Sequence, residues 1–298
     1  MSKKRKKNSN RKANVNKEVT PKKPSVNWKL VRKIALVVIV ALITIISVWD
    51  AWANAKLELN VITIREKNLP GDFDGFRIAH ISDFHSAGRM TDEVVALLEE
   101  AKPDIICITG DLIDSRSKNP DTALALVEKL VGIAQCYFVA GNHEFLIERR
   151  MLDTLLEGMA NMGVILVMDD EEILEKGDSK ISLAGYFWSE REMIEYLSDF
   201  NGYRILMSHY PEDVEYFQKG EYDLVLSGHA HGGQFRLPLI GGLYAPGQGL
   251  FPKYDGGVYS EGKLDLVVNR GIGNSTIPMR FNNPPEVILV ELKCETTN

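Results

Sequence analysis

The most restrictive feature of this chain is a set of short polar clusters, each of which closes or directly follows an apolar run. The clusters hold five of the six histidines together with carboxylate and amide side chains. In chain order they are Asp83-Phe84-His85, Gly110-Asp111, Asn142-His143-Glu144, Ser208-His209 and Gly228-His229-Ala230-His231. Short apolar runs of this kind are typical of buried strands. Carboxylate, amide and imidazole groups gathered in this way are what a pair of divalent metal ions requires.

Strand and helix patterns alternate along the chain, which predicts an α/β fold. The predicted strands are 57–67, 76–82, 105–109, 136–140, 164–168, 181–186, 204–208, 224–227, 264–269 and 287–292. The predicted helices are 91–101, 121–131, 148–162, 189–198 and 211–218. Such units connect by right-handed crossovers, so we expect a buried, mainly parallel sheet. The strand-rich second half predicts a second sheet packed on the first, and the Gly- and Pro-rich stretch 232–257 predicts a long loop.

Charge and hydropathy divide the chain into three parts. Residues 1–33 carry 13 Lys and Arg against one acid, whereas the remainder carries 22 basic and 40 acidic side chains. An uncharged apolar run of sixteen residues, 34–49, follows the basic part, and with 51–53 it is long enough to cross a bilayer. We expect 1–33 to be a disordered basic cytoplasmic tail, 34–53 a transmembrane anchor and 54–298 a folded domain outside the cytoplasm.

Other interpretations of the N-terminal region remain open. The apolar run could be a signal peptide cut near 51–53 or 53–55, where small residues flank a larger one. A buried core helix is less favoured, because the run is apolar on all sides and follows a basic block. The basic tail could bind nucleic acid, but beside a membrane segment a topogenic tail attracted to anionic headgroups is the simpler interpretation. No nucleic-acid partner is therefore expected.

The cysteines exclude two classes of small domain. Cys107, Cys136 and Cys294 are few, odd in number and widely spaced. This pattern is typical neither of a disulfide scaffold nor of a zinc ribbon. Cys107 and Cys136 lie inside predicted strands, so we expect them to be small buried hydrophobic residues.

The polar clusters are expected to meet at one edge of the sheet. In open α/β sheets, sites form beyond the carboxyl ends of the strands, and Asp83, Asp111, Asn142, His209 and His229 each follow a predicted strand. Any single Gly-Asp turn or histidine is weak evidence, but the whole ordered set favours a metal-dependent hydrolase. Nitrogen and oxygen ligands without a thiolate suit Mn, Fe or Zn and disfavour an all-oxygen calcium site.

These clusters resemble the five signature blocks of the calcineurin-like metallophosphoesterase superfamily. The resembling residues are Asp83-x-His85, Gly110-Asp111, Gly141-Asn142-His143-Glu144, His209 and Gly228-His229-x-His231. The similarity runs from about Phe76 to the C-terminus. Segments 208–211, 228–234 and 269–286 are similar to the YkuE-like branch, whose members are exported or membrane-anchored. No position departs from the metal-binding pattern of the family.

The resemblance implies a four-layer α/β/β/α sandwich with two divalent metal ions on its rim. One metal would be bound by Asp83, His85 and His231, and the other by Asn142, His209 and His229. Asp111 would bridge them, since one carboxylate can span two ions about 3.5–4 Å apart.

The family chemistry implied for residues 54–298 is hydrolysis of a phosphoester by a hydroxide that bridges the two metals. His143, which is left over from the ligand set, would protonate the leaving oxygen or stabilise charge there. A hydrogen bond from His143 to Asp111 is the alternative role, and the two can coexist.

Four further polar residues lie in or near the blocks. We interpret His80 as structural, because its position in the first strand has the parity opposite to Asp83. Asp114 and Glu144 are expected to orient ligands or cap helices. Arg280 could meet a substrate phosphate or pair with an acid.

The loop after the last histidine pair is unusually apolar for a Gly-rich segment. Within seventeen residues it contains Phe235, Leu237, Pro238, Leu239, Ile240, Leu243, Tyr244, Leu250 and Phe251. Ordinary packing is one explanation; the other is an apolar lip that faces the bilayer beside the site. The second predicts a phosphodiester or pyrophosphate bond in a lipid or cell-envelope substrate. Alternatives are a serine/threonine-type protein phosphatase of the same fold and a membrane-tethered binding protein without catalysis.

Overall fold

The computed structural model describes residues 27–187, 191–274 and 279–295, so that most of the expected tail 1–33 lies outside the described residues. The chain divides into two compact units, 1–47 and 48–298. Helix α1 (Trp28–Ala53) has 26 residues and exposes its apolar side chains all around. At 1.5 Å per residue it is about 39 Å long, which exceeds the hydrocarbon core of about 30 Å. By length and composition α1 is therefore able to cross a membrane.

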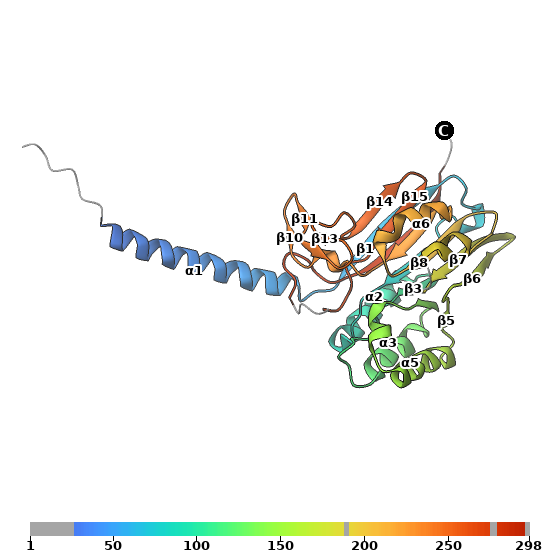
Figure 1. Cartoon of the computed structure of the whole chain (residues 1–298), viewed down its shortest axis with the longest axis horizontal. Coiled ribbons are helices and arrows are strands. Elements are labelled where there is room, and N and C mark those ends of the chain that lie inside the picture. Colours follow the sequence, from blue (N-terminus) through green and yellow to red (C-terminus); the bar gives the residue numbers. More distant parts are fainter. Residues whose placement is uncertain (1–26, 188–190, 275–278, 296–298) are drawn as a thin grey trace, which may run out of the picture. The chain divides into compact units, whose positions relative to one another are not determined.

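The first sheet has six strands in the order β1-β16-β2-β3-β4-β5. They are β1 (Glu58–Glu66), β2 (Arg77–Ile81), β3 (Ile105–Thr109), β4 (Gln135–Val139), β5 (Ile165–Leu166) and β16 (Glu286–Cys294). All neighbours are parallel except β16 and β2. Helices α2 (Thr91–Ala101), α3 (Asp121–Leu130) and α5 (Arg149–Asn161) connect successive parallel strands and cover one face of this sheet (Figure 1).

The second sheet also has six strands, in the order β14-β15-β9-β8-β7-β6. They are β6 (Asp170–Lys176), β7 (Ser179–Tyr186), β8 (Arg204–Ser208), β9 (Leu224–Ser227), β14 (Gly257–Glu261) and β15 (Leu264–Val268). The four central strands are parallel, and an antiparallel hairpin closes each edge. Its outer face is covered by α6 (Val214–Lys219) and the 3-10 turns Arg191–Tyr196 and Pro211–Asp213.

Three hydrophobic layers hold the domain together and confirm the four-layer sandwich. Strand alternation shows this in β3, where Ile106 and Ile108 pack under the first helices while Ile105 and Cys107 face the second sheet. A third layer lies between the second sheet and α6, where Phe217 is buried. Cys107 and Cys136 are buried, as expected.

Several elements differ from the sequence prediction. Strands β6 and β14 were not predicted, because each has several half-exposed or exposed residues and no continuous apolar run. The five-residue helix α4 (Asn142–Leu146) is too short to produce a helical period. The predicted helix 189–198 is a 3-10 segment over its described part.

The predicted long loop 232–257 also contains regular structure. It holds two small antiparallel hairpins, which pair β10 (Arg236–Leu237) with β11 (Gly241–Gly242) and β12 (Tyr244–Ala245) with β13 (Gly249–Leu250). Two-residue strands leave no periodic pattern, so the sequence could not reveal them.

We expect Phe138→Ala to lower the free energy of unfolding by about 3–5 kcal/mol, because Phe138 is fully buried between the first sheet and its helices and its removal leaves a cavity. Denaturant titration of the whole chain measures this change. Val258→Ala on the exposed side of β14 is the matched control and should stay within about 0.5 kcal/mol of the parent chain. A loss below about 1 kcal/mol for Phe138→Ala would contradict the described packing.

Candidate metal centre

All seven predicted ligands lie just beyond the carboxyl ends of parallel strands in the two sheets. They are Asp83 and His85 after β2, Asp111 after β3, Asn142 after β4, His209 after β8, and His229 and His231 after β9. The first sheet supplies all the oxygen ligands and one imidazole, and the second sheet supplies the other three imidazoles. The centre therefore lies where the rims of the two sheets meet.

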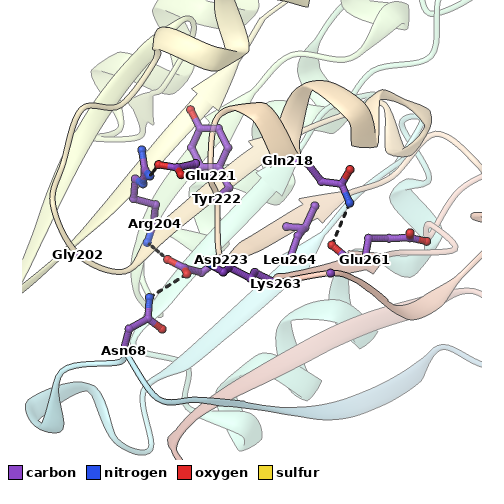
Figure 2. A pocket seen from close by; sticks show the side chains of 11 residues that line it. Asn68, Gly202, Arg204, Gln218, Glu221, Tyr222, Asp223, Glu261, Lys263 and Leu264 are labelled. Atoms are coloured by element: carbon purple, nitrogen blue, oxygen red, sulfur yellow. Dashed lines mark hydrogen bonds and ion pairs between the residues drawn. The ribbon is translucent and has the colours of Figure 1, made fainter.

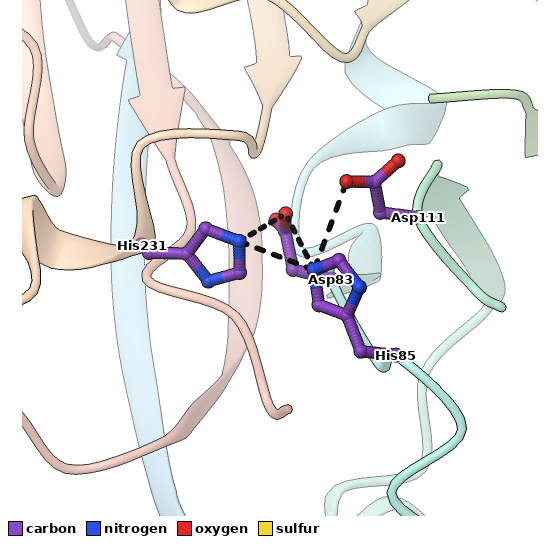
Figure 3. A group of neighbouring side chains, drawn as sticks. All are labelled: Asp83, His85, Asp111 and His231. Carbon is purple, nitrogen blue, oxygen red and sulfur yellow. Dashed lines mark hydrogen bonds and ion pairs between the residues drawn. The ribbon is translucent and has the colours of Figure 1, made fainter. Parts of the chain in front are cut away.

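Four of these side chains converge on one point. Asp83, His85, Asp111 and His231 each place one ligand atom within 4.8 Å of the others. Figure 3 shows the rings of His85 and His231 with their Nε2 atoms toward one another, 3.1 Å apart. Nε2 of His231 lies 3.2 Å from Asp83 Oδ1, and Nε2 of His85 lies 3.7 Å from Asp111 Oδ2.

A second convergence shares one carboxylate with the first. Asp111, His209 and His229 form a second group within the same 4.8 Å limit. Nε2 of His209 lies 3.3 Å from Asp111 Oδ2 and 3.1 Å from His229 Nδ1. Asp111 thus belongs to both groups, which is the position that a bridging ligand must occupy.

The polar atoms of the centre fit a pair of cations. Asp83 Oδ1 and Asn142 Oδ1 are buried and lack a hydrogen-bond partner among the described residues. Buried acceptors without partners cost free energy, and a cation would satisfy them. The donor set contains nitrogen and oxygen but no thiolate, so it suits divalent Mn, Fe or Zn.

The ligand loops adopt an unusual backbone conformation. Positive φ angles occur at Asp83 (50°), His85 (46°), Asp111 (51°), His229 (65°) and His231 (47°). Non-glycine residues rarely adopt this region, and each such residue costs about 1–3 kcal/mol unless its surroundings hold it. The loops must therefore be braced by neighbouring groups.

Two glycines allow the ligand loops to approach each other closely. Gly110 has a φ of 84°, and a Cβ there would overlap the backbone nitrogen of Gly141. A Cβ at Gly228 would overlap the hydroxyl of Ser82. Only glycine fits both positions.

Glu144 braces the Asp111 loop, in agreement with the expected ligand-orienting role. Its buried carboxylate accepts hydrogen bonds from the backbone N–H groups of Gly141 (2.7 Å), Asp111 (2.9 Å), Leu112 (2.8 Å) and Ile113 (3.2 Å). Burial and the nearby Asp111 charge raise the pKa of Glu144 to about 7. The four donors nevertheless explain why a carboxylate is needed here.

Nearby carboxylates raise the pKa of two histidines of the centre, His209 and His85. Its Nδ1–H donates to the Thr109 carbonyl at 2.7 Å, which leaves Nε2 facing Asp111. Burial alone would lower the pKa of His209, but the Asp111 charge outweighs burial and raises this pKa to about 10. Burial lowers the pKa of His229 to about 4 and that of His231 to about 3, so both are neutral at pH 7.

His143 lies beside the two groups with a defined tautomer. Its Nδ1 accepts a hydrogen bond from the Ser115 backbone N–H at 3.0 Å, so the neutral ring carries its hydrogen on Nε2. Nε2 lies 4.0 Å from Asp111 Oδ2, while the backbone N–H of His143 donates to Asp111 Oδ1 at 2.7 Å. Burial lowers the pKa of His143, although the Asp111 charge opposes the shift.

Two neighbouring residues, His80 and Asp114, have other partners. His80 is buried in the core, with Nε2 2.8 Å from the Thr109 hydroxyl. Asp114 forms an ion pair with Arg116 at 2.7 Å and also lies near His85 and His143.

Arg280 forms no ion pair with an acid among the described residues, and contact with a substrate phosphate stays a prediction. Its guanidinium is buried and donates to the backbone carbonyls of Arg270 (2.9 Å) and Gly273 (2.5 Å), and to the Asn274 side chain (3.1 Å). It therefore supports backbone rather than facing an acid. The sequence offered no signal for this role, because a carbonyl partner leaves no trace in residue type.

A separate pocket of about 390 Å³ lies at the opposite ends of the second-sheet strands (Figure 2). Asp223 at its centre accepts hydrogen bonds from the Asn68 side chain and the Arg204 backbone N–H, both at 2.8 Å. Arg204 begins β8 and Asp223 precedes β9, whereas the metal ligands follow these strands. The pocket is thus remote from the metal centre.

We expect metal binding to release a proton from His209 near neutral pH. The raised pKa of His209 keeps it protonated below about pH 10, and a metal needs the neutral ring. The apparent affinity should rise about tenfold per pH unit below that pKa. Calorimetric titration with Mn²⁺ in buffers of different ionisation enthalpy counts the protons. His209→Asn should release one fewer; an unchanged count would contradict the assignment.

The part of the chain that holds the candidate ligands is similar to known proteins. The family model described as calcineurin-like phosphoesterase matches residues 76–233, which include all seven ligand candidates. The chain is 32% identical over 260 residues to the uncharacterized metallophosphoesterase YkuE of Bacillus subtilis (strain 168), covering 80% of this chain and 86% of that protein.

Two other relatives carry more specific names. Identity to the phosphodiesterase YaeI of Escherichia coli (strain K12) is 27% over 224 residues, covering 73% of this chain and 82% of that protein. Identity to the UDP-2,3-diacylglucosamine pyrophosphatase LpxG of Chlamydia trachomatis is 24% over 308 residues, covering 80% and 91% respectively.

Proposed function

The chain belongs to the calcineurin-like phosphoesterase family and is a hydrolase, and from this premise we propose that it is a membrane-anchored, dimetal hydrolase of phosphodiester or pyrophosphate bonds. The observation that carries the proposal is the convergence of six of the seven candidate ligands from both sheets, in two groups that share Asp111. The resemblance of the polar clusters to the calcineurin-like metallophosphoesterases is confirmed at the level of the family.

The donors divide between two cations. Asp83, His85 and His231 would hold one ion, and Asn142, His209 and His229 would hold the other. Asp111 would bridge them. The two groups of converging side chains support this division, since each histidine in it points a ring nitrogen at the shared carboxylate or at its own group.

When bound, the two ions supply Lewis-acid polarisation of the phosphoryl oxygens and a water of lowered pKa as the nucleophile. The chain itself contributes a hydrogen-bond donor at His143 Nε2. The Ser115 N–H occupies Nδ1 as its donor, so a second ring proton there would face another hydrogen. His143 therefore acts as a neutral donor that stabilises charge on the leaving oxygen, rather than as an imidazolium acid.

His143→Ala should keep both metals and lose about 10²–10⁴-fold in turnover, the range typical of a positioned proton-donating side chain. The variant keeps the backbone N–H that donates to Asp111, and for that reason the ligand geometry should survive. Metal analysis and hydrolysis of a soluble aryl phosphodiester measure the two quantities. Loss of metal from this variant would refute the assigned role.

Exposed apolar side chains beside the centre support an amphiphilic substrate. The two hairpins after His231 leave Leu239, Ile240, Leu250 and Phe251 exposed, with Leu239 fully accessible. The same loop contacts the ligand segment, because the Leu243 N–H donates to the Gly233 carbonyl at 3.1 Å. Packing thus accounts for part of the loop, while its tips form an apolar lip.

The chemistry of the relatives agrees with a lipid or cell-envelope substrate. LpxG is named a UDP-2,3-diacylglucosamine pyrophosphatase, which supports an acylated pyrophosphate or phosphodiester here as well. A single-pass anchor with the basic residues 1–33 in the cytoplasm would place the domain on the outer side of the cell membrane, near such substrates.

The double variant Leu239→Asp/Phe251→Asp should lower turnover of a micellar phospholipid phosphodiester by about tenfold or more, because charge opposes contact with an apolar interface. Turnover of the soluble aryl phosphodiester should not change. Ile173→Asp, which alters an exposed residue of β6, is the matched control.

The parent chain decides between the substrate classes. A strong preference for the soluble compound over the micellar one would argue against the lip. Faster release of phosphate from a phosphoserine peptide than from either diester would favour the protein-phosphatase alternative.

A further inference from the structure

The end of helix α1 is hydrogen-bonded to the segment 280–283, here called the brace. The Asn282 N–H donates to Asp50 Oδ1 at 2.7 Å. The Asn54 amide donates to the Arg280 carbonyl at 2.9 Å and accepts from the Asn283 N–H at 3.2 Å. Asp50 and Asn54 belong to the same compact unit as the metal centre. Three hydrogen bonds thus tie the last turn of the apolar helix to one short segment.

Asn283, at one end of the brace, contacts the backbone of His231. Asn283 is fully buried, and its side-chain amide donates to the carbonyls of His231 (2.7 Å) and Gln234 (3.2 Å). Gly232, between them, has a φ of 61°, and a Cβ there would overlap Asn283 Oδ1. Asn283 therefore fills the turn that presents the His231 ring. This turn includes His231 and Gln234, both of which have positive φ angles.

Arg280, at the other end of the brace, is connected to the backbone of Asp83 through Gly273. The buried Arg280 guanidinium donates to the Gly273 carbonyl, and the Gly273 N–H donates to the Asp83 carbonyl at 2.7 Å. The Ile272 N–H donates to the Ser82 carbonyl at 3.3 Å. The Asp83 N–H donates to the Gly110 carbonyl at 3.1 Å. Both polar groups of the Asp83 backbone, which also has a positive φ, are thus held.

Both connections lead to residues predicted to bind the same ion, His231 and Asp83. We propose that Asp50 and Asn54 are positioning residues for the half of the metal centre formed by Asp83, His85 and His231. Strained backbone persists only where its surroundings hold it, and the brace supplies that support from the helix end. His209 is held differently, through the Thr109 carbonyl. This inference rests on the proposed function, and it makes the end of the anchor part of the active site.

The brace has a consequence for processing of the chain. A cut after Ala55, at one of the two small-x-small sequences, would separate both Asp50 and Asn54 from the domain. A cut after Ala53 would remove Asp50 alone. Either product would lose support for one ion, so retention of α1 maintains the complete centre.

The test uses the full chain in detergent micelles, titrated with Mn²⁺. Asn54→Ala should weaken one Mn²⁺ site by about tenfold or more, the range measured when groups that orient metal ligands are removed. The spin-coupled dimanganese spectrum should give way to the six-line spectrum of isolated Mn²⁺. Asn54→Asp keeps the acceptor for the Asn283 N–H and should recover part of the affinity.

Asn68→Ala is the matched control, because it also removes an asparagine hydrogen bond but in the remote pocket (Figure 2). It should leave both Mn²⁺ affinities unchanged. Amide hydrogen exchange of the metal-free chain gives a readout that needs no metal. Peptides that cover 228–234 should exchange faster in Asn54→Ala, whereas peptides over 205–210 should not.

The outcomes distinguish a failure of the proposed positioning role from a failure of the proposed dimetal function. Unchanged Mn²⁺ affinities and unchanged hydrogen exchange in Asn54→Ala would overturn the proposed role of Asn54. Equal effects in Asn68→Ala would overturn it as well, because they would indicate general destabilisation. A parent chain that binds fewer than two Mn²⁺ or hydrolyses no phosphoester would overturn the dimetal function instead. The exchange experiment would then still decide whether the helix end holds the 228–234 turn.

Discussion

The rest of the site depends on the contacts of one group, the carboxylate of Asp111. It lies at the rim where the two sheets meet, within 3.3 Å of His209 from the second sheet and 3.7 Å of His85 from the first. Its other oxygen accepts the His143 backbone N–H, and its own backbone N–H is held by Glu144. One buried carboxyl group therefore links both candidate ion positions to the donor beside them.

The architecture explains why such a centre can exist at all. Parallel strands point their carboxyl ends to one rim, and packing two such sheets face to face brings two rims together. The ligands then leave the strands in strained, buried loops, which would not persist without support. Support comes from groups that are not ligands: the Glu144 carboxylate, the Thr109 carbonyl and the Asn283 amide. The Asn283 backbone N–H in turn donates to Asn54, so hydrogen bonds connect the end of α1 with the loop that carries His231.

Sequence patterns predicted the central elements well, because burial produces a strong local signal. Strand β3 and helix α2 occur with the predicted bounds, since one is continuously apolar and the other has a clear helical period. The edge strands β6 and β14 were missed because solvent reaches one or both of their faces, which weakens the pattern. For the site, the structure confirms the predicted positions of the candidate ligands after the strands, and their role as ligands stays a prediction. The contacts of Arg280 with backbone carbonyls were not predicted, because such carbonyls attract a guanidinium without any sequence signature.

The sequence by itself determined which side chains are candidate metal ligands, which strands they follow, and that an apolar segment precedes the domain. These properties depend on residue chemistry and on neighbours a few positions away. Only the tertiary structure decided how closely the donors converge around Asp111, which nitrogen of His143 carries the hydrogen, and what holds the ligand loops. Those outcomes arise between residues far apart in the chain, as with Asp50 and Asn282, which are 232 positions apart. No local pattern encodes such a contact, because it exists only after both sheets have packed.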